Sequence, residues 1–181
     1  MNLIIETIVS ATFVAAVIRT TTPILFASLG GLLSDLVGSL NVALEGMMLI
    51  SCLTAVLVSA YAPWYVGVLA GMAAGGMLGA VMALFHLRFK ADVILVGFAI
   101  NIIAAGGTVT ALNLATGDKG TSIGRILSGT IPKLDLSFLA PLPLVGPVLT
   151  QMFSGHSYLT WFGAFLVFAI WYFLYRTPEG L

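Results

Sequence analysis

The stretch TPILFASLGGLLSDLVGSLNVALEGMMLI, from Thr22 to Ile50, decides the fold class of this chain. It is apolar and long enough to enter a bilayer, yet Asp35, Asn41 and Glu45 interrupt it. Ionisable groups at membrane depth are costly, so they usually face protein or water rather than lipid. The stretch therefore predicts a broken membrane helix with polar groups at the break, which is how many transporters build a substrate path.

Glycines in the same stretch predict where this helix breaks. Glycine lacks a side chain and adopts backbone conformations that other residues avoid. We expect one broken helix near residues 30–46. The glycines assigned to the break are Gly30, Gly31, Gly38 and Gly46.

The composition places the whole chain in a membrane. The chain has 181 residues, of which 60% are hydrophobic and 8% are charged, whereas a soluble domain is typically about 25% charged. The mean hydropathy is +1.11. The formal net charge is zero, which gives no electrostatic case for binding nucleic acid. We expect a single all-α integral membrane domain over residues 1–181.

Length and polar flanks predict about six transmembrane helices and one long extracytoplasmic loop, Thr116–Ser157. Residues Arg19–Pro23 are expected to end the first helix. Prolines argue against a spanning helix in the loop, although entry of residues 134–153 into the membrane stays open. The predicted spans are Leu3–Ile18, Ile24–Leu40, Val42–Tyr61, Val66–Leu87, Val93–Ala115 and Tyr158–Tyr175.

Positive charge in short loops predicts the orientation. Arg88 and Lys90 lie in one short loop, and Arg176 closes the last span. We expect these residues on the cytoplasmic side, and with six spans both chain termini fall there too. Arg19 and the cations of the long loop then lie outside.

The fourth predicted span has a glycine at every fourth position. Such a face lets a neighbouring helix approach closely. Packing within the protein is the first interpretation, and dimerisation through the same face is the alternative. These glycines are Gly67, Gly71, Gly75 and Gly79.

Few polar residues lie inside the spans, and they are candidates for the transport path. Asn41 and Glu45 are four residues apart, so a helix would place them on one face. They either cap the third helix, with Glu45 in its first turn, or line the path. Asn101 lies mid-span and needs a partner, either a neighbouring helix or a polar ligand. Phe98, three residues earlier, would add an aromatic surface for a heterocycle or a sugar.

No catalytic or metal-binding pattern is present in the sequence. His86 and His156 have no Cys, His or carboxylate at metal-ligand spacing. The fragment Gly117–Ser122, GDKGTS, lacks the spacing of a phosphate-binding loop. We expect neither an enzyme nor a cofactor, and any ATP hydrolysis that powers transport would take place on a separate subunit.

The opening stretch resembles the signature TP-x-L-x-A-x-L-G-G-L-x-S-E-R-x-G-x-x-N-I-G-L-E-G-M-M. This pattern is typical of permeases of bacterial ABC importers of the branched-chain amino acid/ribose type, nearest the nucleoside and simple-sugar branch. Asp35, Leu36 and Ala43 depart from it. The matching positions are Thr22, Pro23, Gly30, Gly31, Ser34, Gly38, Asn41, Leu44, Glu45, Gly46, Met47 and Met48.

Three further segments resemble the same family. They are KADVILVGFAIN at Lys90–Asn101, LPLVGPVL at Leu142–Leu149 and LYRTPEGL at the end of the sequence. Members of the family are longer, so the chain looks like the amino-terminal part of such a permease, without the segment that couples to the ATPase.

The resemblance implies a function and a set of partners. It implies import of a nucleoside or simple sugar across a bacterial inner membrane. The implied partners are an ATP-binding subunit, a second permease subunit and an extracytoplasmic solute-binding protein, which the long loop is expected to contact. A branched-chain amino acid is the alternative solute. A truncated membrane protein that does not transport is the alternative of another class.

Overall fold

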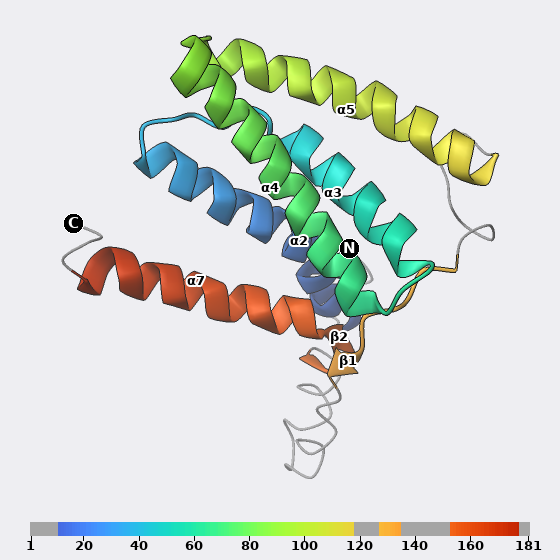
Figure 1. Ribbon diagram of the computed structural model, residues 1–181. Helices are drawn as coiled ribbons and strands as arrows, with labels where there is room; N and C mark the ends of the chain where they lie inside the picture. The colour runs from blue at the N-terminus through green and yellow to red at the C-terminus, as the bar shows by residue number, and fades with distance from the viewer. Residues whose placement is uncertain (1–10, 118–126, 135–152, 178–181) are drawn as a thin grey trace, which may run out of the picture. The chain divides into compact units, whose positions relative to one another are not determined.

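The computed structural model describes residues 11–117, 127–134 and 153–177 of the 181-residue chain. This part of the chain is helical apart from one pair of two-residue strands (Figure 1). Most of the predicted long loop and both chain ends lie outside the described residues. The elements are α2 (Ala11–Leu36), α3 (Leu44–Ser59), α4 (Trp64–Phe89), α5 (Val93–Thr116), β1 (Lys133–Leu134), β2 (His156–Ser157) and α7 (Tyr158–Arg176).

Four of the described helices are long and apolar enough to cross a membrane. They are α2 from Thr12 onward, α4, α5 and α7, and α3 is a shorter apolar helix. The described residues thus show an all-helical membrane architecture. Where the sequence predicts a division between two spans, at Arg19–Pro23, the structure has one continuous helix.

The predicted turn at Arg19–Pro23 is wrong because Pro23 lies inside α2. Proline removes one backbone donor, and membrane helices tolerate it when neighbouring groups satisfy the freed backbone. Two threonines just before it bond back to their own helix. The Thr20 hydroxyl donates to the carbonyl of Ala16 at 3.1 Å, and the Thr22 hydroxyl donates to that of Ile18 at 2.8 Å. The threonine hydroxyls that suggested a polar helix end thus hydrogen bond to carbonyls of the preceding turn, and the helix continues.

Two compact units make up the described chain, and each is considered by itself. The first combines the residues up to Leu29 with those from Ile131 onward. In it, α2 and α7 run parallel, because Thr22 bonds to Thr160 at 3.2 Å and the ring of Phe26 stacks on Phe162. The strands β1 and β2 pair antiparallel just before α7.

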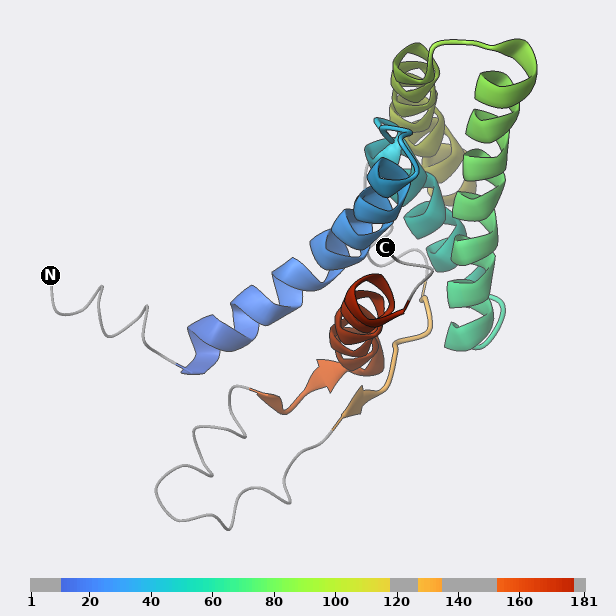
Figure 2. The same cartoon turned by 90° about the vertical axis from the view of Figure 1, so that its left-hand side faces the viewer.

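The second unit, Gly30–Thr130, contains α3, α4 and α5, which lie side by side (Figures 1 and 2). Its buried centre is formed by Ala43, Met82 and Ile100. A left-handed residue, Lys90, ends α4 at a φ of 52°, and the Asp92 carboxylate accepts from the backbone of Ile94 at 2.8 Å to begin α5. The turn between α4 and α5 is therefore tight and capped.

The interruption between α2 and α3 is short. Helix α2 ends at Leu36 and α3 begins at Leu44. Gly38 has a φ of +80°, and its N–H donates to the carbonyl of Asp35 at 2.8 Å. Of the four glycines assigned to the break, only Gly38 lies in it, because Gly30 and Gly31 are inside α2 and Gly46 is inside α3.

We expect Gly38→Ala to lower the free energy of unfolding by about 1–2 kcal/mol, because the left-handed conformation crowds any β-carbon. Gly30→Ala is the matched control, since a β-carbon at Gly30 meets no atom within 4 Å. Thermal denaturation of both variants in detergent would show the difference. Equal melting temperatures would mean that the chain does not hold Gly38 in this conformation.

Candidate functional site

Asn101 joins α5 to the residues that begin α3. Its side-chain oxygen accepts from the backbone N–H of Gly46 at 2.8 Å. Its side-chain nitrogen donates to the carbonyl of Val42 at 2.8 Å. The amide predicted to need a partner therefore uses both ends on backbone groups 55 and 59 residues away.

The contact completes the start of α3. The first turn of a helix has backbone N–H groups without a partner in the helix itself. Ala43 precedes the helix and cannot cap it with a side chain, and no side-chain cap is formed there. The Asn101 oxygen binds one of these N–H groups from the neighbouring helix, so α5 caps α3.

Glycines allow the two helices to come this close. A β-carbon at Gly46 would lie 2.8 Å from the Asn101 oxygen and 3.0 Å from the Ile100 carbonyl oxygen. A β-carbon at Gly97 would lie 2.9 Å from the side chain of Val42. Each helix thus contributes one glycine to the contact, on either side of the amide.

Asn41 stabilises the turn before α3 rather than capping the helix. Its side-chain oxygen accepts from the backbone of Ala43 at 3.0 Å, and its nitrogen points to the sulfur of Met47 at 3.7 Å. Of the two alternatives for Asn41, capping of α3 is not observed, because the residue at the N-cap position is Ala43. Because Asn41 lies outside α3, it does not share a helix face with Glu45.

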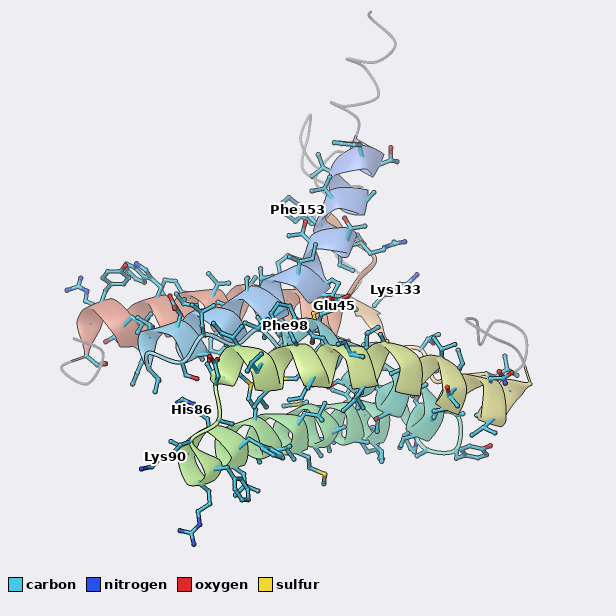
Figure 3. The ribbon with its side chains drawn as sticks, turned by 90° about the horizontal axis from the view of Figure 1, so that it is seen from above. Glu45, His86, Lys90, Phe98, Lys133 and Phe153 are labelled. Atoms are coloured by element: carbon cyan, nitrogen blue, oxygen red, sulfur yellow. The ribbon has the colours of Figure 1, made fainter. Side chains whose placement is uncertain are left out.

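Glu45 and Phe98 are both exposed within this unit, and both are labelled in Figure 3. Glu45 lies in the first turn of α3, as predicted, where the helix dipole stabilises a carboxylate by about 0.3–1 kcal/mol. Phe98 is 54% exposed, whereas Asn101 is directed at α3. The structure thus brings Asn101 together with the start of α3 but leaves Phe98 at the surface.

A cavity of about 230 Å³ lies beside the break. Asn41 and Gly79 line it, together with residues that the sequence does not indicate as site residues. Ser34 and Ser39 flank Gly38, and His86 lies in the last turn of α4. The full lining is Ser34, Ser39, Asn41, Met47, Gly79, Met82, Ala83, His86 and Val93.

The glycine face of α4 meets α3 over part of its length. A β-carbon at Gly67 would lie 2.7 Å from the Ala55 carbonyl oxygen, and one at Gly71 would lie 2.8 Å from that of Ser51. At Gly75 the nearest atom is the Ser51 hydroxyl, at 2.7 Å. Gly79 differs, because nothing lies within 4 Å and the residue borders the cavity.

This difference predicts unequal effects along one face. Gly71→Ala should lower the free energy of unfolding by about 1–3 kcal/mol, because the added carbon meets backbone atoms of α3 that cannot move independently. Gly79→Ala should cost less than about 0.5 kcal/mol, as substitutions away from tight contacts do. Unfolding of both variants in detergent would test this, and equal losses would contradict the α3–α4 contact.

Comparison with known proteins gives the family. The family described as branched-chain amino acid transport system / permease component matches residues 13–181 of this chain. The guanosine ABC transporter permease protein NupQ of Bacillus subtilis is 33% identical over 98% of this chain and 54% of its own length. The nucleoside ABC transporter permease protein NupC of Lactococcus lactis is 27% identical over 93% of this chain and 53% of its own length.

A protein of Haloferax volcanii, provisionally named as a glucose ABC transporter permease, is 30% identical over 92% of this chain and 48% of its own length. The chain thus spans about half the length of these relatives. No solved structure matches. With several apolar helices and a family match over residues 13–181, the chain is a multi-pass membrane protein and belongs to the branched-chain amino acid transport system / permease component family.

Proposed function

We propose that this chain contributes to the membrane permease of an ABC importer for a nucleoside or a simple sugar. The observation that carries the proposal is the similarity to a guanosine permease over 98% of the chain. The match covers only about half of the length of that relative. We therefore assign transport to the complete importer and not to this chain alone. In it, ATP hydrolysis takes place on a separate ATP-binding subunit, so the permease itself is not an enzyme.

The segment between α2 and α3, where the helix is interrupted, is proposed to form part of the substrate path. Asn41 lines the cavity beside it, and Asn101 holds the start of α3 in place. Glu45 and Phe98 are exposed in this unit and are proposed to face the solute. A hydrogen-bonded break of this kind lets backbone and amide groups contact a neutral polar solute.

The position of Glu45 favours a nucleoside or sugar over the alternative, a branched-chain amino acid. An amino acid carries a carboxylate, and a helix N-terminus is the usual place to bind one. At the start of α3, however, the first turn already holds the negatively charged Glu45. Glu45 would repel the carboxylate of an amino acid and attract only its ammonium group, so the usual carboxylate site at a helix start is lost here, whereas a nucleoside or sugar does not need one.

The proposed orientation is that of a bacterial inner-membrane protein with Arg88, Lys90 and Arg176 in the cytoplasm. Ser34, near the end of α2, lines the same cavity as His86, in the last turn of α4, which supports placing these two ends on one side. Arg176 is placed in the cytoplasm because it is a cation at the end of a candidate membrane span. The cytoplasmic amino terminus rested on a turn at Arg19–Pro23, and continuous α2 removes that support.

The proposed partners are an ATP-binding subunit, a second permease subunit and an extracytoplasmic solute-binding protein. The segment between α5 and α7 is the proposed contact for the binding protein. Co-purification of the chain with an ATP-binding subunit would support this assembly. Self-dimers alone would favour the alternative of a membrane protein that does not transport.

Uptake of radiolabelled solutes by the complete transporter tests the proposal. Guanosine, a simple sugar and leucine should be compared. We expect Glu45→Ala to lower uptake of the preferred solute about tenfold, as loss of a contact worth about 1.4 kcal/mol would. Asn101→Ala should lower uptake at least as much, because α3 loses its cap, while both variants still reach the membrane. Asn113→Ala, on the same helix, is the control. Leucine uptake would refute the proposed solute class, and normal uptake in both variants would refute the site.

A further inference from the structure

A second cavity, of about 370 Å³, lies in the unit formed by α2, α7 and the two short strands. It is separate from the cavity beside the helix break and shares no residue with it. Three basic residues line it, each from a different element. They are Arg19 of α2, Lys133 of β1 and His156 of β2.

The charge around this cavity is of one sign. Arg19 and Lys133 are exposed, and His156 is only 3% exposed. None of the described residues that line the cavity is acidic. A hollow whose described lining holds cations but no carboxylate attracts an anion from its surroundings.

Hydrogen-bond donors complete the lining. The hydroxyl of Thr160 contacts those of Thr22 and Ser157, each at 3.2 Å. Ser157 precedes α7 and makes no side-chain cap, and the lining continues into the first turn of α7. Backbone N–H groups at a helix start bind anions, so they add to a site that the charged side chains already define.

The position of the cavity at one end of α7 indicates the kind of anion. It lies at the beginning of α7, a candidate membrane span. Tyr158 and Trp161 of this first turn are 46% and 37% exposed, and such aromatics concentrate at headgroup depth. Phospholipid phosphates lie at that depth in both leaflets, and basic side chains near the membrane surface attract anionic headgroups.

We infer that the cavity lined by Arg19, Lys133 and His156 binds the phosphate group of a membrane phospholipid. Arg19, Lys133, Ser157 and Thr160 all line this one cavity, so a single oxygen-rich anion bound in it would meet both cations and both hydroxyls. The acyl chains would lie along the apolar surfaces of α2 and α7, where Phe165 is 65% exposed. The inference does not depend on the transported solute.

Native mass spectrometry of the purified, delipidated chain tests the site. Phosphatidylglycerol is added as the probe, and diacylglycerol, which lacks the phosphate, as its control. We expect phosphatidylglycerol to bind and Arg19→Gln/Lys133→Gln to weaken it about tenfold, the effect of two screened charges. Arg88→Gln/Lys90→Gln removes the same charge from the other unit and should change the affinity less than about twofold.

Competition with inorganic phosphate distinguishes the two sources of the ligand. Retention of the lipid in millimolar phosphate supports a headgroup site, whereas displacement supports a phosphate site filled from solution and overturns the lipid assignment. Equal weakening by both charge pairs, or equal binding of diacylglycerol, would overturn the site itself. Lys133→Gln alone, outside the helices, keeps the test valid if the Arg19 substitution perturbs folding, which circular dichroism would reveal.

Discussion

Asn101→Leu is expected to lower the free energy of unfolding by about 2–4 kcal/mol. Leucine has a similar volume but cannot hydrogen bond, so the Gly46 N–H and the Val42 carbonyl both lose their side-chain partner. Each buried group left unsatisfied costs about 1–3 kcal/mol. The buried residues nearest to this contact are the apolar Ala43, Met82 and Ile100, which offer no replacement side-chain donor or acceptor.

Denaturation in mixed micelles, followed by circular dichroism, would measure this loss. Asn113→Leu is the matched control, because it makes the same change on α5 without breaking a side-chain bond seen among the described residues. Asn101→Asp adds a second comparison. Aspartate keeps the acceptor for Gly46 but loses the donor to Val42 and brings an ionisable group into apolar surroundings, so it should not restore the stability of the wild type. Equal stability of the Asn101→Leu and Asn113→Leu variants would show that the amide does not cap α3.

The need of Asn101 for a partner could be predicted from the sequence, because an amide in an apolar span is costly to leave alone. The identity of the partner could not. It depends on how closely α3 and α5 approach, and that distance is set by Gly46 and Gly97 on two different helices. A glycine pair so far apart in sequence has no periodic signal, unlike the four-residue spacing on α4.

The helix boundaries, too, could be predicted from the sequence only in part. Arg19–Pro23 combines a charge, hydroxyls and a proline, which in water would end a helix. In α2 the hydroxyls bond to the preceding turn and the helix continues. The observed start of α3, Leu44, also differs from the predicted start, Val42, for a related reason. Asn41 is a good capping residue by type, but its side chain closes the turn at Ala43 while the cap comes from Asn101.

The apolar composition, by contrast, correctly predicts the features that do not depend on contacts between distant residues. The all-helical architecture follows from the need to satisfy every backbone group within lipid. The tight turn after α4 and the acidic residue in the first turn of α3 are local features as well. The cavity beside the break could not be predicted, because Ser34 of α2, Ser39 of the break and His86 of α4 are far apart in sequence or in different elements and come together only through packing.

Gly46→Val is expected to destabilise the unit by about 3 kcal/mol, at the upper end of the cost of overpacking. The new β-carbon would lie 3.0 Å from the Asn101 α-carbon and 3.0 Å from the Ile100 carbonyl oxygen. Both are backbone atoms, so α5 must shift to admit the side chain, and that shift would also stretch the two bonds of Asn101. Gly76→Val is the control, because a β-carbon there meets nothing within 4 Å.

A double-mutant cycle separates the two origins of this cost. If Gly46→Val acts partly by displacing the Asn101 amide, adding it to Asn101→Leu should cost less than the sum of the single changes. Coupled neighbours typically differ from additivity by about 0.5–3 kcal/mol. Unfolding of the four proteins under one condition gives the value. Strict additivity would mean that steric pressure at Gly46 and the Asn101 cap act independently, and that α5 stays in place when the valine is introduced.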